Sequence, residues 1–141
     1  KEGGVSYLRA PFWFVAGTVA TGNIQAGRRK AYGDSTLVGT VITLVNVWAY
    51  IETAPTGAAL IFDINYIDPD TGVSTSVFTT RPQIAAGANE VTSTAFVLPN
   101  SRPINSVFTL DIDQVGSTVA GANLSIQLDV VAFTQSFTII S

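Results

Sequence analysis

Hydrophobic and polar residues alternate along most of this chain with a period of two, which is typical of half-buried β-strands. Residues 59–67 show the pattern clearly. Four apolar side chains share one face of this segment: Leu60, Phe62, Ile64 and Tyr66. Asp63 and Asn65 lie on the opposite face. The following turn, Asp68-Pro69-Asp70-Thr71-Gly72, has the residues that a hairpin turn favours. We therefore expect this segment to be part of the scaffold.

The same pattern, interrupted by Gly- and Pro-containing turns, continues along the chain without a segment of helical period. It predicts strands over residues 12–20, 36–52, 59–67, 73–80, 90–98, 104–114 and 122–140, and a polar loop with room for a short strand over 21–35. Seven or eight evenly spaced strands predict an all-β fold, an antiparallel two-sheet sandwich that is jelly-roll-like. Residues 1–11 read as an N-terminal arm or linker, and residues 12–141 as a single β-sandwich domain.

The segment 36–52 differs from the others because it is apolar on both faces. One face carries Val38, Ile42, Leu44, Trp48 and Tyr50, and the other carries Val41, Val45, Val47 and Ile51. An antiparallel strand with two apolar faces needs a second cover. One explanation is a β-bulge that exchanges the two faces midway. The other is a subunit interface, for which Val45, Val47 and Ile51 are the candidate contact residues.

Composition favours the interface. Of the 141 residues, 47% are hydrophobic and only 12% are charged, against about 25% charged in an average domain. This deficit suggests that part of the surface is covered, most simply by copies of the same chain. A net charge of −3 gives no reason to expect a nucleic-acid partner. The chain contains no apolar run of about 18 residues, so membrane insertion is not expected either. Met is absent even at position 1, which predicts a processed chain or a piece of a longer protein.

Candidate chemistry is sparse, because the chain contains neither His nor Cys. The Ser-His-Asp and Cys-His catalytic arrangements and the common zinc sites are therefore excluded. Asp111 and Asp113 project from one face of a strand and could form a glycosidase pair, as in a polysaccharide depolymerase. The alternation favours a simpler interpretation, an exposed polar face opposite Leu110 and Ile112. We therefore expect no enzyme activity, no cofactor and no metal site.

Three further features are candidates for contacts with a partner. The basic cluster Arg28, Arg29 and Lys30 could bind an acidic surface, although such a loop is more often only solvated. Two loops rich in small residues, 53–57 and 115–123, are expected at an end of the sandwich, where binding surfaces are commonly built. The candidate receptor contacts in these loops are Thr56 in the first and Thr118 in the second.

Aromatic residues form the last candidate group: Trp13, Tyr32, Trp48 and Tyr50. If exposed, these side chains could stack on sugars. At strand positions they are more often part of a core or an interface.

A resemblance adds to this reading. The segments TAPTGAALIFDIN (53–65), RPQIAAGANE (81–90) and LDIDQVGSTVAGANLSIQLDV (110–130) resemble a β-sandwich module that recurs in tailed-bacteriophage virion proteins, and DIDQVGSTVAG is the most specific part. The resemblance runs from Ala16 to Val130. It implies a non-enzymatic virion structural protein, commonly trimeric, and offers no catalytic residues to carry over.

Within that family we expect a surface-exposed tail-fibre or receptor-binding module of the phage particle, made in the cytoplasm of the bacterial host. Its partners would be copies of itself as a homotrimer, other virion proteins, and a host-surface glycan or protein. The alternative is a capsid decoration protein that clamps capsomers. A depolymerase that uses Asp111 and Asp113 is the least favoured reading.

Overall fold

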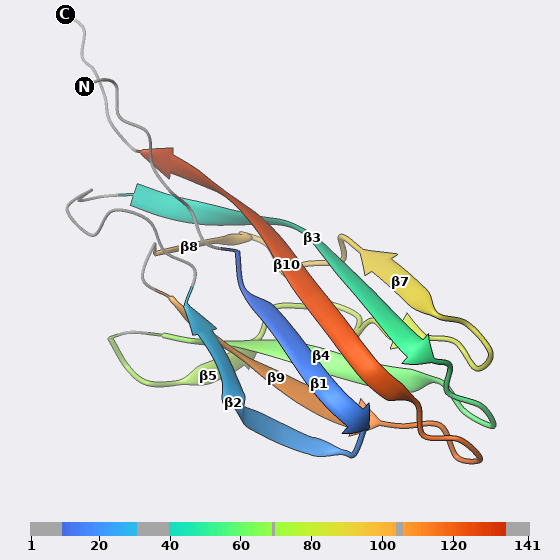
Figure 1. Ribbon diagram of the computed structural model, residues 1–141. Helices are drawn as coiled ribbons and strands as arrows, with labels where there is room; N and C mark the ends of the chain where they lie inside the picture. Colours follow the sequence, from blue (N-terminus) through green and yellow to red (C-terminus); the bar gives the residue numbers. More distant parts are fainter. Residues whose placement is uncertain (1–9, 31–39, 69, 104–105, 135–141) are drawn as a thin grey trace, which may run out of the picture.

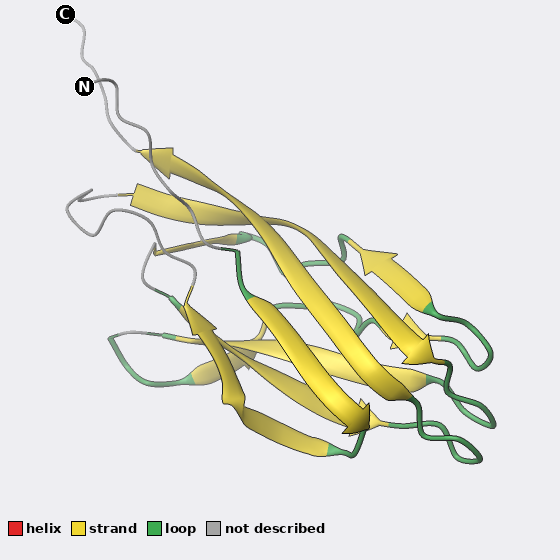
Figure 2. Ribbon diagram, viewed as in Figure 1, coloured by secondary structure: helices red, strands yellow, loops and turns green. Residues whose placement is uncertain are grey.

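The computed structural model describes residues 10–30, 40–68, 70–103 and 106–134, and shows strands joined by turns with no helix in these ranges (Figure 2). One sheet has the order β1 (Phe12–Thr18), β10 (Ala122–Thr134), β3 (Thr40–Thr53) and β7 (Glu90–Ser93), and β8 (Ser101–Pro103) also pairs with β3. The other has the order β2 (Gly22–Lys30), β9 (Val107–Gln114), β4 (Leu60–Ile67) and β5 (Ser74–Ser76), and β6 (Gln83–Ile84) also pairs with β4. Each pairing is antiparallel.

This arrangement confirms the predicted all-β sandwich. The two sheets pack face to face, and the chain crosses repeatedly from one to the other (Figure 1). β5 and β6 share one edge position, and β7 and β8 share another, so the ten strands of the described ranges fill the eight positions of a jelly roll. Within the described ranges, no helix is long and apolar enough to span a membrane.

The edge strands depart from the expected segments. The segments 73–80 and 90–98 were expected to be continuous strands, but regular pairing covers only Ser74–Ser76 and Glu90–Ser93. Beyond these strands, Phe78 and Phe96 form an isolated bridge and stack their rings with centroids 5.4 Å apart. Both side chains are buried, so the chain leaves the sheet edge in order to complete the core. The segment 21–35, expected to be mainly loop, contains the nine-residue β2.

The core fills the space between the sheets with one cluster of apolar side chains. Its largest fully buried members are Trp13, Phe62, Phe108, Ile42, Leu44, Ile51, Leu60, Ile64, Ile84, Leu110, Leu124 and Ile126. They come from the central strands of both sheets and from edge strands β1 and β6. The outer faces of the two sheets are therefore the surfaces on which a site can be built.

A β-bulge in β3 decides which side chains reach the outer face of the first sheet. Leu44 pairs with Val130 and Asn46 pairs with Asp129, so Val45 is an extra residue relative to β10. Before the bulge the core receives Ile42 and Leu44. After it the core receives the odd-numbered residues, Val47, Ala49 and Ile51. The bulge is the explanation that applies to this two-faced strand.

The bulge also corrects part of the predicted interface. Val47 and Ile51 are fully buried inside a single chain, so neither has surface left to offer a second subunit. Val45 is 44% exposed and is the member of the predicted set that remains on the surface.

Candidate functional site

The outer face of the second sheet carries a small cluster of carboxylates. Asp63 on β4 pairs directly with Asp111 on β9, and Asp113 follows two residues later. As the alternation predicted, Asp111 and Asp113 lie on the side opposite the buried Ile112. Arg81 reaches this group, with its Nε 3.7 Å from Asp63 Oδ2 and 3.4 Å from Asp113 Oδ2.

Asp63 is the unusual member, because it is only 6% exposed although it lies on an outer face. Burial raises the pKa of Asp63, the nearby Asp113 raises it further, and a hydrogen bond from Ser76 and the charge of Arg81 act in the opposite direction. Asp111 accepts a hydrogen bond from Asn65 Nδ2. The carboxylates are therefore held by polar neighbours from β4, β5 and the loop that contains Arg81.

This cluster has some of the chemistry that glycoside hydrolysis needs, since the pKa of one carboxyl group is raised and a second carboxyl group lies nearby. However, the guanidinium of Arg81 contacts both groups, where a glycosidic oxygen would have to bind. A shallow depression of about 390 Å³ adjoins the cluster and is lined by Ile61, Ser76, Phe78, Thr79, Thr80, Arg81 and Gln83. None of the three aspartates lines it. Among the described residues, no group of acidic side chains is placed to hold a metal ion.

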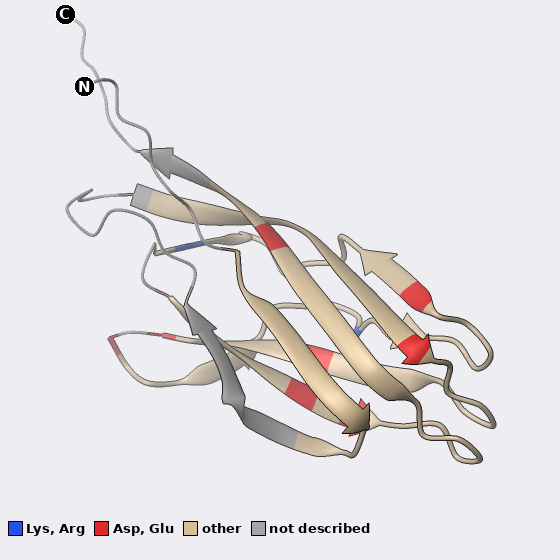
Figure 3. Ribbon diagram, in the orientation of Figure 1, with Lys and Arg blue, Asp and Glu red and all other residues tan. Residues whose placement is uncertain are grey.

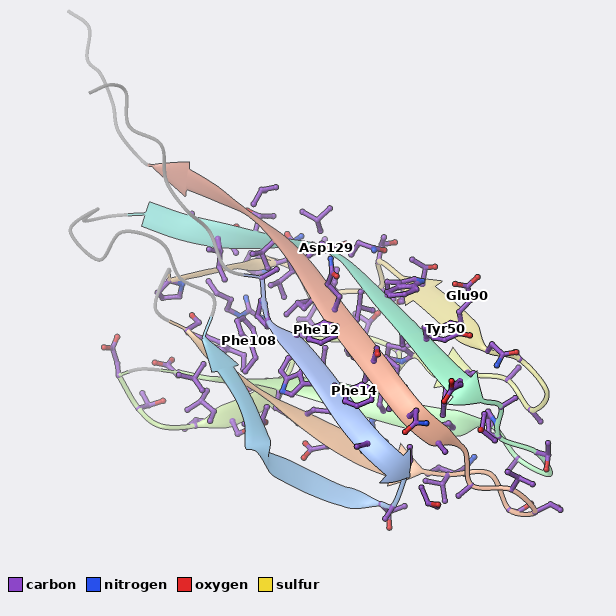
Figure 4. All side chains as sticks on the ribbon, in the orientation of Figure 1. Phe12, Phe14, Tyr50, Glu90, Phe108 and Asp129 are labelled. Carbon is purple, nitrogen blue, oxygen red and sulfur yellow. The ribbon has the colours of Figure 1, made fainter. Side chains whose placement is uncertain are left out.

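The outer face of the first sheet is of a different kind, because it exposes aromatic rings. Phe12 and Phe14 project from β1, and Tyr50 projects from β3 (Figure 4). Trp48, two residues before Tyr50, is exposed on the same face of β3. These four side chains are between 36% and 56% exposed. Trp48 and Tyr50 lie nearly parallel, with centroids 6.2 Å apart and planes 16° apart. We call these four residues, with the polar side chains between and beside them, the aromatic face.

Polar side chains on the aromatic face hold one another in place. The indole Nε1 of Trp48 donates a hydrogen bond to Glu90 Oε1 on β7, at 3.0 Å. On β10, Asp129 accepts hydrogen bonds from Gln127 Nε2 at 2.5 Å and from Asn46 Nδ2 at 3.2 Å. The face therefore combines exposed rings with hydrogen-bonding groups whose positions are fixed.

The two small-residue loops lie together at one end of the sandwich, and they bind each other. Thr56 N donates to Val119 O at 2.9 Å, and Thr118 N donates to Thr56 O at 2.9 Å. Gly116 sits so close to this contact that an added Cβ would lie 1.9 Å from Val119 O. The backbones of Thr56 and Thr118 thus serve the loop contact, and the Thr118 side chain is exposed beside it.

The predicted basic cluster is not part of the same surface. Arg28, Arg29 and Lys30 fall in β2 rather than in a loop. Lys30 pairs with Val107, at the end of β9 opposite the loop that contains Thr118. The side chains of the cluster, and the whole of Tyr32, lie outside the described part of the structure.

The sequence offered Trp48 and Tyr50 as candidates for stacking on sugars but favoured a core or interface position for them, and it did not single out Phe12 and Phe14. Trp13 is buried, as strand aromatics were expected to be. Trp48 and Tyr50 are exposed, because the bulge at Val45 turns them outward. Phe12 and Phe14 alternate with Trp13, so the FWF triplet was the sequence signal for two exposed rings beside a buried one.

Comparisons with known proteins identify no family. No protein-family model matches the chain, and no curated protein matches it. One solved structure with a similar arrangement is the Drosophila NLP-core, described in connection with pentamer formation and histone binding. It is 12% identical, the match covers 85% of this chain and 98% of that chain, and the TM-score is 0.41. A likeness at this level carries no inference about function.

Proposed function

We propose that this protein is a non-enzymatic structural component of a tailed-bacteriophage particle, where it acts as a receptor-binding or tail-fibre module. The observation that carries the proposal is the aromatic face, on which Phe12, Phe14, Trp48 and Tyr50 are exposed together. Exposed apolar side chains that gather on one face of a domain mark that face as a candidate interaction surface. The resemblance of the segment DIDQVGSTVAG to virion modules supplies the phage setting.

The contacts of the carboxylate cluster support the non-enzymatic part of the proposal. Both Asp63 and Asp113 contact Arg81, which neutralises charge that a hydrolytic mechanism would need to use. Of the residues that the structure describes, none of the three aspartates lines the depression beside the cluster. These contacts explain the cluster as an ion-pair network on the surface of a sheet.

The assembly state is a separate part of the proposal, a homotrimer. The two-faced β3 no longer argues for it, because the bulge accounts for that pattern. The low charged fraction, 12%, still does. Light scattering on the full chain at micromolar concentration tests this part, and a monomer would contradict it.

The location on the particle can be tested with antibodies raised against the full chain. Immunogold labelling of purified phage particles should place gold at the tail tip or along the fibres. Label distributed over the capsid would instead support the decoration alternative, in which the same face contacts capsomers. Particles without label would overturn both versions of the proposal.

A further inference from the structure

The aromatic face is built as two rows of side chains that run across the strands. Phe12 pairs with Gln127, which pairs with Trp48. In the next row, Phe14, Ser125 and Tyr50 follow one another in the same way, and Tyr50 pairs with Glu90. β10 therefore places polar side chains between two aromatic pairs, Phe12 with Phe14 on β1 and the Trp48–Tyr50 pair on β3. The two pairs stand about 10 Å apart, which is two strand spacings.

This order is the reverse of a protein–protein interface, which has an apolar centre and a polar rim. Here the centre is polar, since β10 places Ser125 and Gln127 between the rings of β1 and β3, with Asp129 following on the same face. Asp129, Phe12, Phe14 and Tyr50 are labelled in Figure 4. A flat protein partner would bury these polar groups opposite its own apolar centre, which is costly unless each finds a partner. A ligand with polar and apolar groups side by side avoids that cost.

The charge of the aromatic face further limits the class of ligand that it can bind. Three acidic residues share the outward register of the exposed rings, Glu52 on β3, Glu90 on β7 and Asp129 on β10, and acidic positions are coloured red along these strands in Figure 3. The two cationic side chains that the structure describes are engaged elsewhere. Arg81 contacts Asp63 and Asp113 on the other sheet, and Arg102 stacks over the Tyr66 ring at 4.8 Å. The described part of the face thus repels anions, which disfavours sulfated, phosphorylated or uronic-acid polymers.

From this arrangement we propose that the aromatic face binds a neutral polysaccharide chain, an inference that rests on the proposed receptor-binding function. The C–H faces of sugar rings would pack on Tyr50, Trp48 and Phe14, whose rings offer rigid apolar area at low entropic cost. Sugar hydroxyls would donate to Glu90 and Gln127. The bonds Trp48–Glu90 and Gln127–Asp129 hold these acceptors in place before the ligand arrives.

Tryptophan fluorescence gives a direct assay on the full chain. The chain contains two tryptophans, of which Trp13 is buried and Trp48 is exposed, so acrylamide quenching reports mainly on Trp48. We would titrate the protein with cellohexaose, maltohexaose, xylohexaose and mannohexaose, and with a hyaluronan hexasaccharide as the anionic probe. At least one neutral probe should protect Trp48 from quenching, and hyaluronan should not. Protection by hyaluronan alone, or by no probe at millimolar concentration, would overturn the inference.

Variants show whether the protection comes from the proposed site. Tyr50→Ala should weaken binding of the protective probe at least tenfold, while Glu90→Gln, which keeps an acceptor oxygen, should weaken it by no more than a few-fold. The matched control is Val73→Ala, an exposed apolar residue in the β4–β5 turn, and it should bind like the wild type. Equal binding by Tyr50→Ala and the control would overturn the inference.

A cell-binding assay separates this inference from the proposed function. Labelled full-length protein would be added to the bacterial strain that the phage infects, after treatment of the cells with periodate or with proteinase K. Loss of binding after periodate alone supports a glycan. Loss after protease alone overturns the glycan inference and leaves the receptor-binding function standing. Absence of binding to untreated cells would instead overturn the receptor-binding function itself.

Discussion

Among the glycines that the structure describes, Gly116 is the one at which an added methyl group should destabilise the fold most. An added Cβ at this position would lie 1.9 Å from Val119 O, and 2.8 Å from both Thr56 N and Thr56 O. All three neighbours are backbone atoms, so no rotation of a side chain can relieve the contact. Gly116→Ala should therefore force the loop that contains residues 115–121 away from the loop that contains Thr56.

The cost can be worked out from the bonds that this movement breaks. Thr56 N to Val119 O, Thr118 N to Thr56 O and Gly116 N to Ala120 O are hydrogen bonds of 2.9, 2.9 and 3.1 Å. At about 0.5–1.5 kcal/mol each, their loss lowers the free energy of unfolding by about 2–4 kcal/mol. For a domain of this size, that corresponds to a fall in Tm of about 6–15 °C.

Thermal and urea unfolding, followed by circular dichroism, measure the effect. Ser117→Ala is the control, because it changes the next residue of the same loop at an exposed side chain, and it removes an atom instead of adding one. It should change the free energy of unfolding by no more than about 0.5 kcal/mol. If Gly116→Ala melts together with Ser117→Ala, the two loops are not locked as the hydrogen bonds indicate, and the reasoning is refuted.

Two other perturbations test the bulge and the carboxylate cluster. Val47→Asp should abolish folding or lower the free energy of unfolding by about 3–5 kcal/mol, because it buries an unpaired charge. Val45→Asp, on the exposed side, should change the free energy of unfolding by less than about 0.5 kcal/mol. Equal effects of the two variants in urea unfolding would argue against the bulge. Burial raises the pKa of Asp63 above its ordinary 3.8, so the folded chain binds that proton more tightly than the unfolded chain does, and the wild type gains stability from this group as the pH falls through the raised pKa. Asp63→Asn keeps an oxygen that can accept from Ser76 and does not titrate. The free energy of unfolding of Asp63→Asn minus that of the wild type should therefore be most positive at neutral pH and should become smaller as the pH falls toward about 4. A difference that grows on acidification would contradict the raised pKa of Asp63.

The scaffold could be predicted because it follows from local alternation. In β4 the apolar residues Leu60, Phe62 and Ile64 all reach the core, as the period of two requires. The edge strands could not be delimited in the same way. Val77 and Phe78 are both buried although they are adjacent, because the chain leaves the sheet there and packs against Phe96. A pattern of period two carries no information about such a departure.

The candidate site was harder to predict because it depends on pairing between distant strands. The sequence shows that Asp63 and Asp111 both point outward, but only the pairing of β4 with β9 places them opposite each other. The aromatic face depends on a single unmatched residue. Without the bulge at Val45, alternation assigns Trp48 and Tyr50 to the side of Leu44, which is the core. Nothing in the local composition marks where a bulge falls.

The bulge in β3 also constrains how this protein can evolve. Deleting the codon for Val47, or inserting one codon just before it, would shift the following residues by one position relative to β10, so that Trp48 and Tyr50 would face inward and Ile51 outward. Deleting the codon for Val45 would remove only the extra residue and would leave these side chains on their present faces. Single-residue insertions and deletions after the bulge should therefore be purged by selection, whereas substitutions at positions 48 and 50 leave the frame of the strand intact. Among natural variants, new ligand preferences on this face should arise by amino-acid replacement within a strand of constant length.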